Sequence, residues 1–135
     1  MNYLLDTHYI LWTLFEPYKI NRNILRILKS ENESKLVSGI SLWEISLKYS
    51  LGKLELSGTN PEEIYEKISE SGFDLIPIEN TVLASCYKLP KKENHKDPFD
   101  RLLIWQALAN DFTLITADKT IEEYIQDGLK VEMER

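Results

Sequence analysis

The sequence is poor in cysteine and histidine, with one cysteine, Cys86, and two histidines among 135 residues. A single cysteine excludes a disulfide within the chain and a cysteine-rich zinc site, and it fits a reducing compartment. No histidine or cysteine cluster is present, so a metal site in this chain has to draw on carboxylate oxygens. Such a donor set suits Mg²⁺ or Mn²⁺.

Long apolar runs are also missing. No segment approaches the ~18 uninterrupted apolar residues that a membrane span needs. The first residues, MNYLLDTHYILW, lack a basic region, and Asp6 interrupts their apolar run too early for a signal peptide. We therefore expect a cytoplasmic protein that makes no contact with membranes.

Positive charge is scarce, since 16 basic residues face 22 acidic ones and the net charge is −6. This balance argues against sequence-independent binding of nucleic acid, because phosphate binding normally needs an excess of Lys and Arg. Basic residues do gather locally, at Lys91, Lys92, Lys96 and Arg101. If several acids are collected at one metal site, the rest of the surface is less negative than the total implies.

The chain has no internal repeat, low-complexity tract or linker, so we expect one domain over residues 1–135. Predicted strands alternate with predicted helices, which indicates an α/β sandwich with three layers: a central, mainly parallel sheet of about five strands, flanked by helices. In such sheets the ligand site lies off the carboxyl ends of the strands. The predicted strands are 2–6, 35–38, 73–78, 112–116 and 129–132, and the predicted helices are 9–15, 22–30, 41–51, 61–72, 81–89, 98–110 and 119–126.

Four acidic residues fall at the predicted strand-to-helix junctions. Asp6 and Asp118 follow strands, and Glu44 and Asp100 lie near the starts of helices. Each has a simple structural explanation, since aspartate is a good N-cap and Ser41 with Glu44 forms a capping box. We assign the cap of the last long helix to Asp97, which precedes Pro98 in the stretch DPFDRLLIWQA.

Helical periodicity weakens the capping explanation for two of these acids. Asp100 shares a face with Leu103, Ile104 and Ala107, which are committed to the core, and Glu44 lines up with Leu47 and Leu51. Two carboxylates about 5 Å apart repel by roughly 3 kcal/mol at an effective dielectric near 20. Four of them converging would cost on the order of 10 kcal/mol, so they must take up protons or hold cations. A divalent ion held there suits the cleavage of phosphodiesters.

Four motifs resemble those of the PIN-domain ribonucleases, specifically the VapC-type toxins of bacterial and archaeal toxin–antitoxin pairs. They occur in the family's order and span nearly the whole chain. The motifs are LLDTH at 4–8, SLWEISLKYSLGKLEL at 41–56, DPFDRLLIWQA at 97–107 and TLITAD at 113–118.

The resemblance implies a PIN-like nuclease domain that cleaves RNA with Mg²⁺ or Mn²⁺, forms a homodimer and is inhibited by a cognate antitoxin, itself DNA-binding. The family's catalytic and metal-binding acids carry over to Asp6, Glu44, Asp100 and Asp118. Its supporting hydroxyls carry over to Thr7 and Thr116, which would orient the acids or the attacking water. One departure is Trp105, at a position where relatives often have a smaller residue.

Two other readings stay open. The chain could be a non-catalytic or degenerate PIN-like binding module that keeps its acids only as caps. A different metal-dependent phosphoryl-transfer domain fits less well, because the DTH at 6–8 lacks the second aspartate that a haloacid dehalogenase-like phosphatase has after its first strand, and Asp6 has no adjacent acid such as a response-regulator receiver requires.

The remaining polar residues have weaker signals. Two roles are equally supported for Arg101: contact with a scissile phosphate, or an ion pair with a neighbouring acid such as Asp97. Lys48 is expected to form an i,i+4 ion pair with Glu44. His8 is expected to be a packed or surface side chain, and His95, in a polar loop, receives no role.

Overall fold

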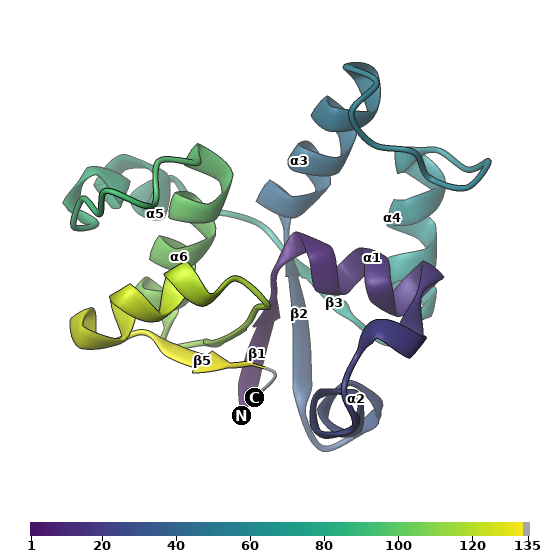
Figure 1. Cartoon of the computed structure of the whole chain (residues 1–135), viewed down its shortest axis with the longest axis horizontal. Helices are drawn as coiled ribbons and strands as arrows, with labels where there is room; N and C mark the ends of the chain where they lie inside the picture. The colour runs from purple at the N-terminus through teal and green to yellow at the C-terminus, as the bar shows by residue number, and fades with distance from the viewer. Residues whose placement is uncertain (134–135) are drawn as a thin grey trace.

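The computed structural model describes residues 1–133 and contains one five-stranded parallel sheet (Figure 1). The strand order is β3-β2-β1-β4-β5, and every neighbouring pair is parallel. The predicted α/β sandwich with a central parallel sheet is confirmed. The strands are β1 (Asn2–Leu5), β2 (Ser34–Ser38), β3 (Asp74–Ile76), β4 (Thr113–Ile115) and β5 (Lys130–Glu132).

Helices connect these strands. Two segments differ from the sequence prediction: residues 81–89 divide into an α-helix and a 3₁₀ turn, and residues 119–127 form a 3₁₀ helix throughout. Within residues 1–133 no helix has both the length and the apolar character needed to cross a bilayer. The α-helices are α1 (Thr7–Phe15), α2 (Arg22–Lys29), α3 (Gly39–Ser50), α4 (Pro61–Glu70), α5 (Asn80–Ser85) and α6 (Pro98–Asn110); the 3₁₀ helices are η1 (Pro17–Lys19), η2 (Cys86–Lys88) and η3 (Lys119–Asp127).

Side-chain alternation along the central strand produces the two cores. Tyr3 and Leu5 of β1 face a cluster built with α1, α2 and α4, whereas Leu4 faces a second cluster built with α6 and η3. Both faces of the sheet are therefore covered by helices, which is why consecutive residues of the central strands are apolar, as at Leu4 and Leu5 of β1 and Leu114 and Ile115 of β4. The result is the predicted three-layer arrangement.

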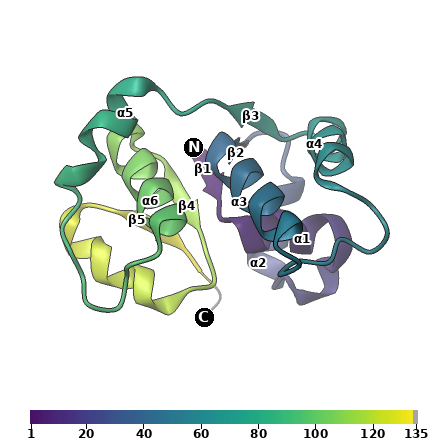
Figure 2. The ribbon, with the colours of Figure 1, turned by 90° about the horizontal axis from the view of Figure 1, so that it is seen from above.

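The strand order places a topological switch point between β1 and β4. From β1 the chain proceeds through β2 to β3 on one side, and from β4 it proceeds to β5 on the other. Neighbouring connections that leave in opposite directions open a crevice at the carboxyl ends of the strands. Figure 2 looks onto this edge, where α3 lies between α6 and the pair α1 and α4 and contacts all three.

The helix starts differ from the predicted caps in one respect. α3 begins at Gly39, and the hydroxyl of Ser38 accepts a hydrogen bond from the amide of Ile40, so the capping box of Ser41 and Glu44 is wrong. Glu44 consequently lies in the second turn of α3 and its carboxylate is free for other partners. The Asp97 cap is confirmed, since its carboxylate accepts hydrogen bonds from the first amides of α6.

Candidate active site

Asp6 and Thr116 form the floor of the site, one residue beyond β1 and one beyond β4. The backbone amide of Asp6 bonds the carbonyl of Ile115, which continues the strand pairing and holds the two residues side by side. The Thr116 hydroxyl donates to Oδ2 of Asp6 at 2.7 Å, while Oδ1 caps α1 through the amide of Tyr9 at 3.2 Å. Burial raises the pKa of Asp6 above its usual range, although the Thr116 bond acts in the opposite direction.

Asp118 lies at the start of η3, beside the same threonine. Its amide donates to the Thr116 hydroxyl at 3.1 Å, and its Oδ1 accepts from the amide and the hydroxyl of Thr120 at 3.0 and 2.6 Å. Thr116 therefore contacts both acids that follow the central strands. Asp6 and Asp118 are N-caps, as the capping explanation predicts. The two strand-to-helix junctions that they cap follow β1 and β4, the strands on either side of the switch point.

Glu44 reaches the site from α3 and is buried, with 7% of its surface exposed. Its Oε1 accepts from the Thr7 hydroxyl at 2.6 Å, and its Oε2 pairs with the ammonium of Lys48 at 2.5 Å. The hydrogen bond to Glu44 also raises the pKa of Lys48. The predicted ion pair between Lys48 and Glu44 is confirmed. The prediction that Glu44 and Leu51 lie on one face committed to the core is wrong at Leu51, which is 58% exposed.

Asp100 projects from the first turn of α6 and carries the clearest electrostatic signal of the site. Burial raises its pKa to about 7, and repulsion by Asp97, Glu44, Asp6 and Asp118 adds to the shift. Within residues 1–133 its carboxylate accepts no hydrogen bond, while Leu103 and Ile104 on the same face are buried as predicted. Asp6, Glu44 and Asp118 therefore all act on the charge of Asp100. Within residues 1–133 the group of three or more possible ligands within 4.8 Å of one another includes Asp100 and Asp118 but neither Asp6 nor Glu44.

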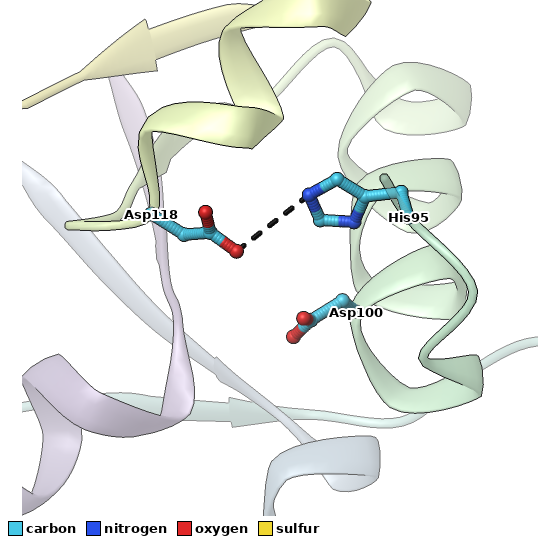
Figure 3. A group of neighbouring side chains, drawn as sticks. All are labelled: His95, Asp100 and Asp118. Atoms are coloured by element: carbon cyan, nitrogen blue, oxygen red, sulfur yellow. Dashed lines mark ion pairs between the residues drawn. The ribbon is translucent and has the colours of Figure 1, made fainter. Parts of the chain in front are cut away.

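His95, for which the sequence predicts no role, lies against Asp100 and Asp118 (Figure 3). One ring nitrogen and a carboxylate oxygen each from Asp100 and Asp118 lie within 4.8 Å of one another. His95 is only 4% exposed, although its neighbours in the chain are polar and mostly exposed. A lone histidine in a polar loop has no periodic pattern that reveals burial, so only the tertiary structure could identify it.

Within residues 1–133 the Arg101 side chain does not pair with Asp97, and its contact with a scissile phosphate stays a prediction. Its guanidinium donates to the carbonyls of Leu89 and Pro90 at 2.9 and 3.2 Å and to the hydroxyl of Tyr124 at 3.2 Å. It thereby joins α6 to the segment before it and to η3. Beside it a cavity of about 410 Å³ is lined by Lys91, Lys92, Glu93, His95, Lys96 and Arg101.

These residues fit a divalent cation. The donors are mainly carboxylate oxygens, which hard cations prefer, and they come from four separate segments. Hydrogen bonds orient Asp6, Glu44 and Asp118 without using every lone pair, and the Asp100 carboxylate accepts none within residues 1–133. Lys48 forms an ion pair with Glu44, and repulsion by neighbouring carboxylates adds to the raised pKa of Asp100, so negative charge is crowded around this residue. A positive ion at this position would relieve that repulsion.

A parallel α/β sandwich with carboxylates gathered at its switch point is typical of metal-dependent enzymes that act on phosphate esters. This chain belongs to the PIN-domain family, whose model matches residues 3–125. Proteins with this domain are generally metal-dependent nucleases.

Solved structures share the fold at low sequence identity. A chain of VapBC2 from Rickettsia felis, bound to a DNA fragment from the promoter, has a TM-score of 0.69 and 20% identity, with 98% of each chain covered. A chain of VapBC-1 from nontypeable Haemophilus influenzae has a TM-score of 0.67 and 21% identity, again with 98% of each covered. The PIN domain endonuclease Utp24 has a TM-score of 0.56 and 16% identity, covering 99% of this chain and 85% of its own. Among curated protein sequences none matches this chain.

Proposed function

We propose that the chain is a Mg²⁺- or Mn²⁺-dependent endoribonuclease that hydrolyses RNA phosphodiester bonds and acts as the growth-inhibiting toxin of a toxin–antitoxin pair. The observation that carries this proposal is the crowding of Asp6, Glu44, Asp100 and Asp118, which helps to raise the pKa of Asp100 to about 7. Asp97, the cap of α6, also contributes to this shift, but Asp6, Glu44 and Asp118 act on Asp100 from three other segments of the chain.

In the proposed reaction Asp6, Glu44, Asp100 and Asp118 bind the divalent ion. The ion supplies the charge that activates water and stabilises the pentacovalent phosphorus. Thr116 holds Asp6 through its hydroxyl, and Thr7 holds Glu44, so neither carboxylate has to reorganise when charge develops on the phosphate.

RNA would reach these acids along the basic segment that leads into α6. Lys91 and Lys96 are exposed and have no ion-pair partner within residues 1–133, so both are available to phosphates. Lys92 is instead paired with Asp127 at 2.9 Å. The arrangement places positive charge beside the acidic site despite the net charge of −6.

The proposed partners are a cognate DNA-binding antitoxin and a second copy of the chain, in the cytoplasm. Support comes from the shared fold with VapBC chains, one of them from a complex bound to promoter DNA. It also comes from large apolar side chains left in solvent on α3 and α4, among them Trp43 at 59% and Tyr65 at 51% exposure. Such residues are common where proteins associate.

The test is cleavage of a labelled single-stranded RNA pool by purified protein, with a DNA pool of the same sequences beside it. We expect RNA cleavage with Mg²⁺ or Mn²⁺, none in EDTA, and none by Asp6→Asn or Asp100→Asn. The matched control is Asp74→Asn, which removes an exposed acid at the opposite edge of the sheet. The ions should also raise the melting temperature of the wild type but not that of Asp6→Asn.

Cleavage that persists in EDTA, or in both site variants, would overturn the nuclease assignment. Stable wild-type protein that binds metal but leaves every RNA intact would favour a degenerate, binding-only domain. Growth arrest on expression, relieved by Asp6→Asn and by the antitoxin encoded beside the gene, would separately test the role as a toxin.

A further inference from the structure

His95 is held more firmly than a residue in a polar loop usually is. Its amide bonds the carbonyl of Lys92 at 3.1 Å, and its ring packs edge-on against Tyr124 with centroids 5.6 Å apart. Arg101 fixes the other side of Tyr124 through its hydroxyl. The imidazole is therefore preorganised at the side of the acid cluster, with almost no freedom to turn away.

The hydrogen bonds around the ring assign its protons. The Thr120 hydroxyl has one proton and donates it to Oδ1 of Asp118, a carboxylate that can only accept. The oxygen of Thr120 must then accept from Nε2 of His95, which it contacts closely. Nδ1 is buried and has no hydrogen-bond partner within residues 1–133. In the neutral ring this nitrogen keeps its lone pair.

A buried acceptor without a partner is costly, and native structures usually satisfy it with water, an ion or a ligand. Figure 3 shows the ring beside both carboxylates. Nε2 lies 3.6 Å from Oδ2 of Asp118, and the other ring nitrogen, Nδ1, lies on the side of Asp100. Metal-bound histidines typically donate their second ring N–H to a fixed acceptor, as Nε2 does here through Thr120.

We propose that His95 supplies a nitrogen ligand to the metal site, together with Asp100 and Asp118, and that this nitrogen makes the site prefer Mn²⁺ over Mg²⁺. The inference rests on the proposed metal-dependent function. Its physical basis is that Mg²⁺ prefers oxygen and retains its waters, so imidazole adds little to its binding, whereas Mn²⁺, a transition-metal ion, gains more from a nitrogen ligand than Mg²⁺ does.

The test is the spectrum of bound Mn²⁺, which does not depend on RNA cleavage. In pulsed electron paramagnetic resonance the wild-type protein should show nitrogen hyperfine coupling from one imidazole. His95→Gln, which keeps a polar side chain of similar length, should lose the coupling. It should also lose roughly 10–100-fold in Mn²⁺ affinity, and less in Mg²⁺ affinity measured by competition.

Two matched controls separate a ligand from a residue that only positions Asp118. Thr120→Val removes the bond that orients the ring but keeps the imidazole, so the coupling should remain. His8→Gln removes the other histidine, which is exposed, and should leave the spectrum unchanged.

Bound Mn²⁺ without nitrogen coupling in the wild type, or equal losses of Mn²⁺ and Mg²⁺ affinity in His95→Gln, would overturn this proposal alone. A wild-type protein that binds no Mn²⁺ would overturn the proposed function as well. If His95→Gln fails to fold, the wild-type spectrum with and without ¹⁵N-labelled histidine still decides the question.

Discussion

The pKa of a single side chain, Asp100, is informative about the chemistry of the site. Its pKa is raised to about 7 by burial and by four neighbouring carboxylates, so at neutral pH it is partly protonated. In an unfolded chain the same group has a pKa near 3.8. The native state thus binds this proton more tightly, and the metal-free protein loses stability as the pH rises between these two values.

We therefore expect the melting temperature of the metal-free protein to rise as the pH falls from about 8 to about 5, because Asp100 becomes neutral in the folded state. Asp100→Asn should be more stable than the wild type at the upper pH and show a flatter profile, whereas Asp74→Asn should follow the wild type. Calorimetry in EDTA measures this. Identical profiles for the wild type and Asp100→Asn would contradict the raised pKa.

The affinity for the metal should depend on pH in the opposite sense. Binding requires the ionised carboxylate, so Mn²⁺ affinity should increase as the pH is raised from about 6 to about 8, with up to one proton released for each ion bound at Asp100. Titration calorimetry in buffers of different ionisation enthalpy counts that proton. In Asp100→Asn the release should disappear along with most of the affinity.

Thr116 is hydrogen-bonded to two of the acidic residues of the site, Asp6 and Asp118. It is fully buried, donates to Asp6 and accepts from the amide of Asp118. Thr116→Val keeps the shape but removes both bonds, so we expect metal affinity and cleavage to fall roughly 10–100-fold. Thr116→Ser should restore most of both. Full activity in the valine variant would show that Asp6 needs no support from this hydroxyl.

At the scale of elements, α6 combines a functional end with a structural one. Asp97 caps it, Asp100 turns into the site, and Arg101 joins it to the preceding segment and to η3. Trp105, the unusual residue of this helix, donates to the hydroxyl of Ser85 at 3.0 Å and so packs α6 against α5. The helix is held from both sides, which fixes the position of Asp100.

Arg101→Ala should accordingly act on stability. It removes three hydrogen bonds and leaves the carbonyls of Leu89 and Pro90 without this donor, so we expect a loss of about 1–3 kcal/mol in the free energy of unfolding. Because Arg101 also holds Tyr124 beside His95, metal affinity in the folded fraction should fall, but by less than in Asp100→Asn. Unchanged stability together with lost cleavage would instead restore the predicted contact to phosphate. Urea denaturation and cleavage assays distinguish the two.

At the scale of the whole molecule, the uneven distribution of charge matters more than the total. Acids concentrate at the switch point, while Lys91 and Lys96 lie on the segment beside it. The negative sum of −6 therefore does not exclude binding of RNA at this edge.

Replacing Lys91 and Lys96 with alanine should weaken RNA binding equally across sequences and reduce its salt dependence by roughly 0.7 in log–log slope for each lost phosphate contact. Binding is measured in the Asp100→Asn background, so that RNA is not cut. Alanine at Arg26 and Lys29 is the matched control, because these exposed residues of α2 lie at the opposite edge of the sheet (Figure 1). An unchanged slope would place the RNA path elsewhere.

Local sequence pattern was sufficient to predict the order of the strands and helices and the position of most of the four acids at strand-to-helix junctions. Strand and helix order, the cap at Asp97 and the buried stripe of Asp100 all depend on residues close in sequence, and those predictions are confirmed. The capping box at Ser41 was wrong because Ser38, three residues earlier, competes successfully for the helix start. Both serines are good N-cap residues, but only Ser41 has the glutamate of a capping box, so the local rule favoured the wrong serine.

The sequence by itself determined an α/β sandwich whose acidic residues follow its strands, because periodicity and capping are short-range properties of the chain. Only the tertiary structure decided which side chains meet. The strand order β3-β2-β1-β4-β5 brings Asp6 and Thr116 together across 110 positions and lets a loop histidine settle against Asp100 and Asp118. Contacts of that range depend on how the layers pack, and no local pattern encodes them.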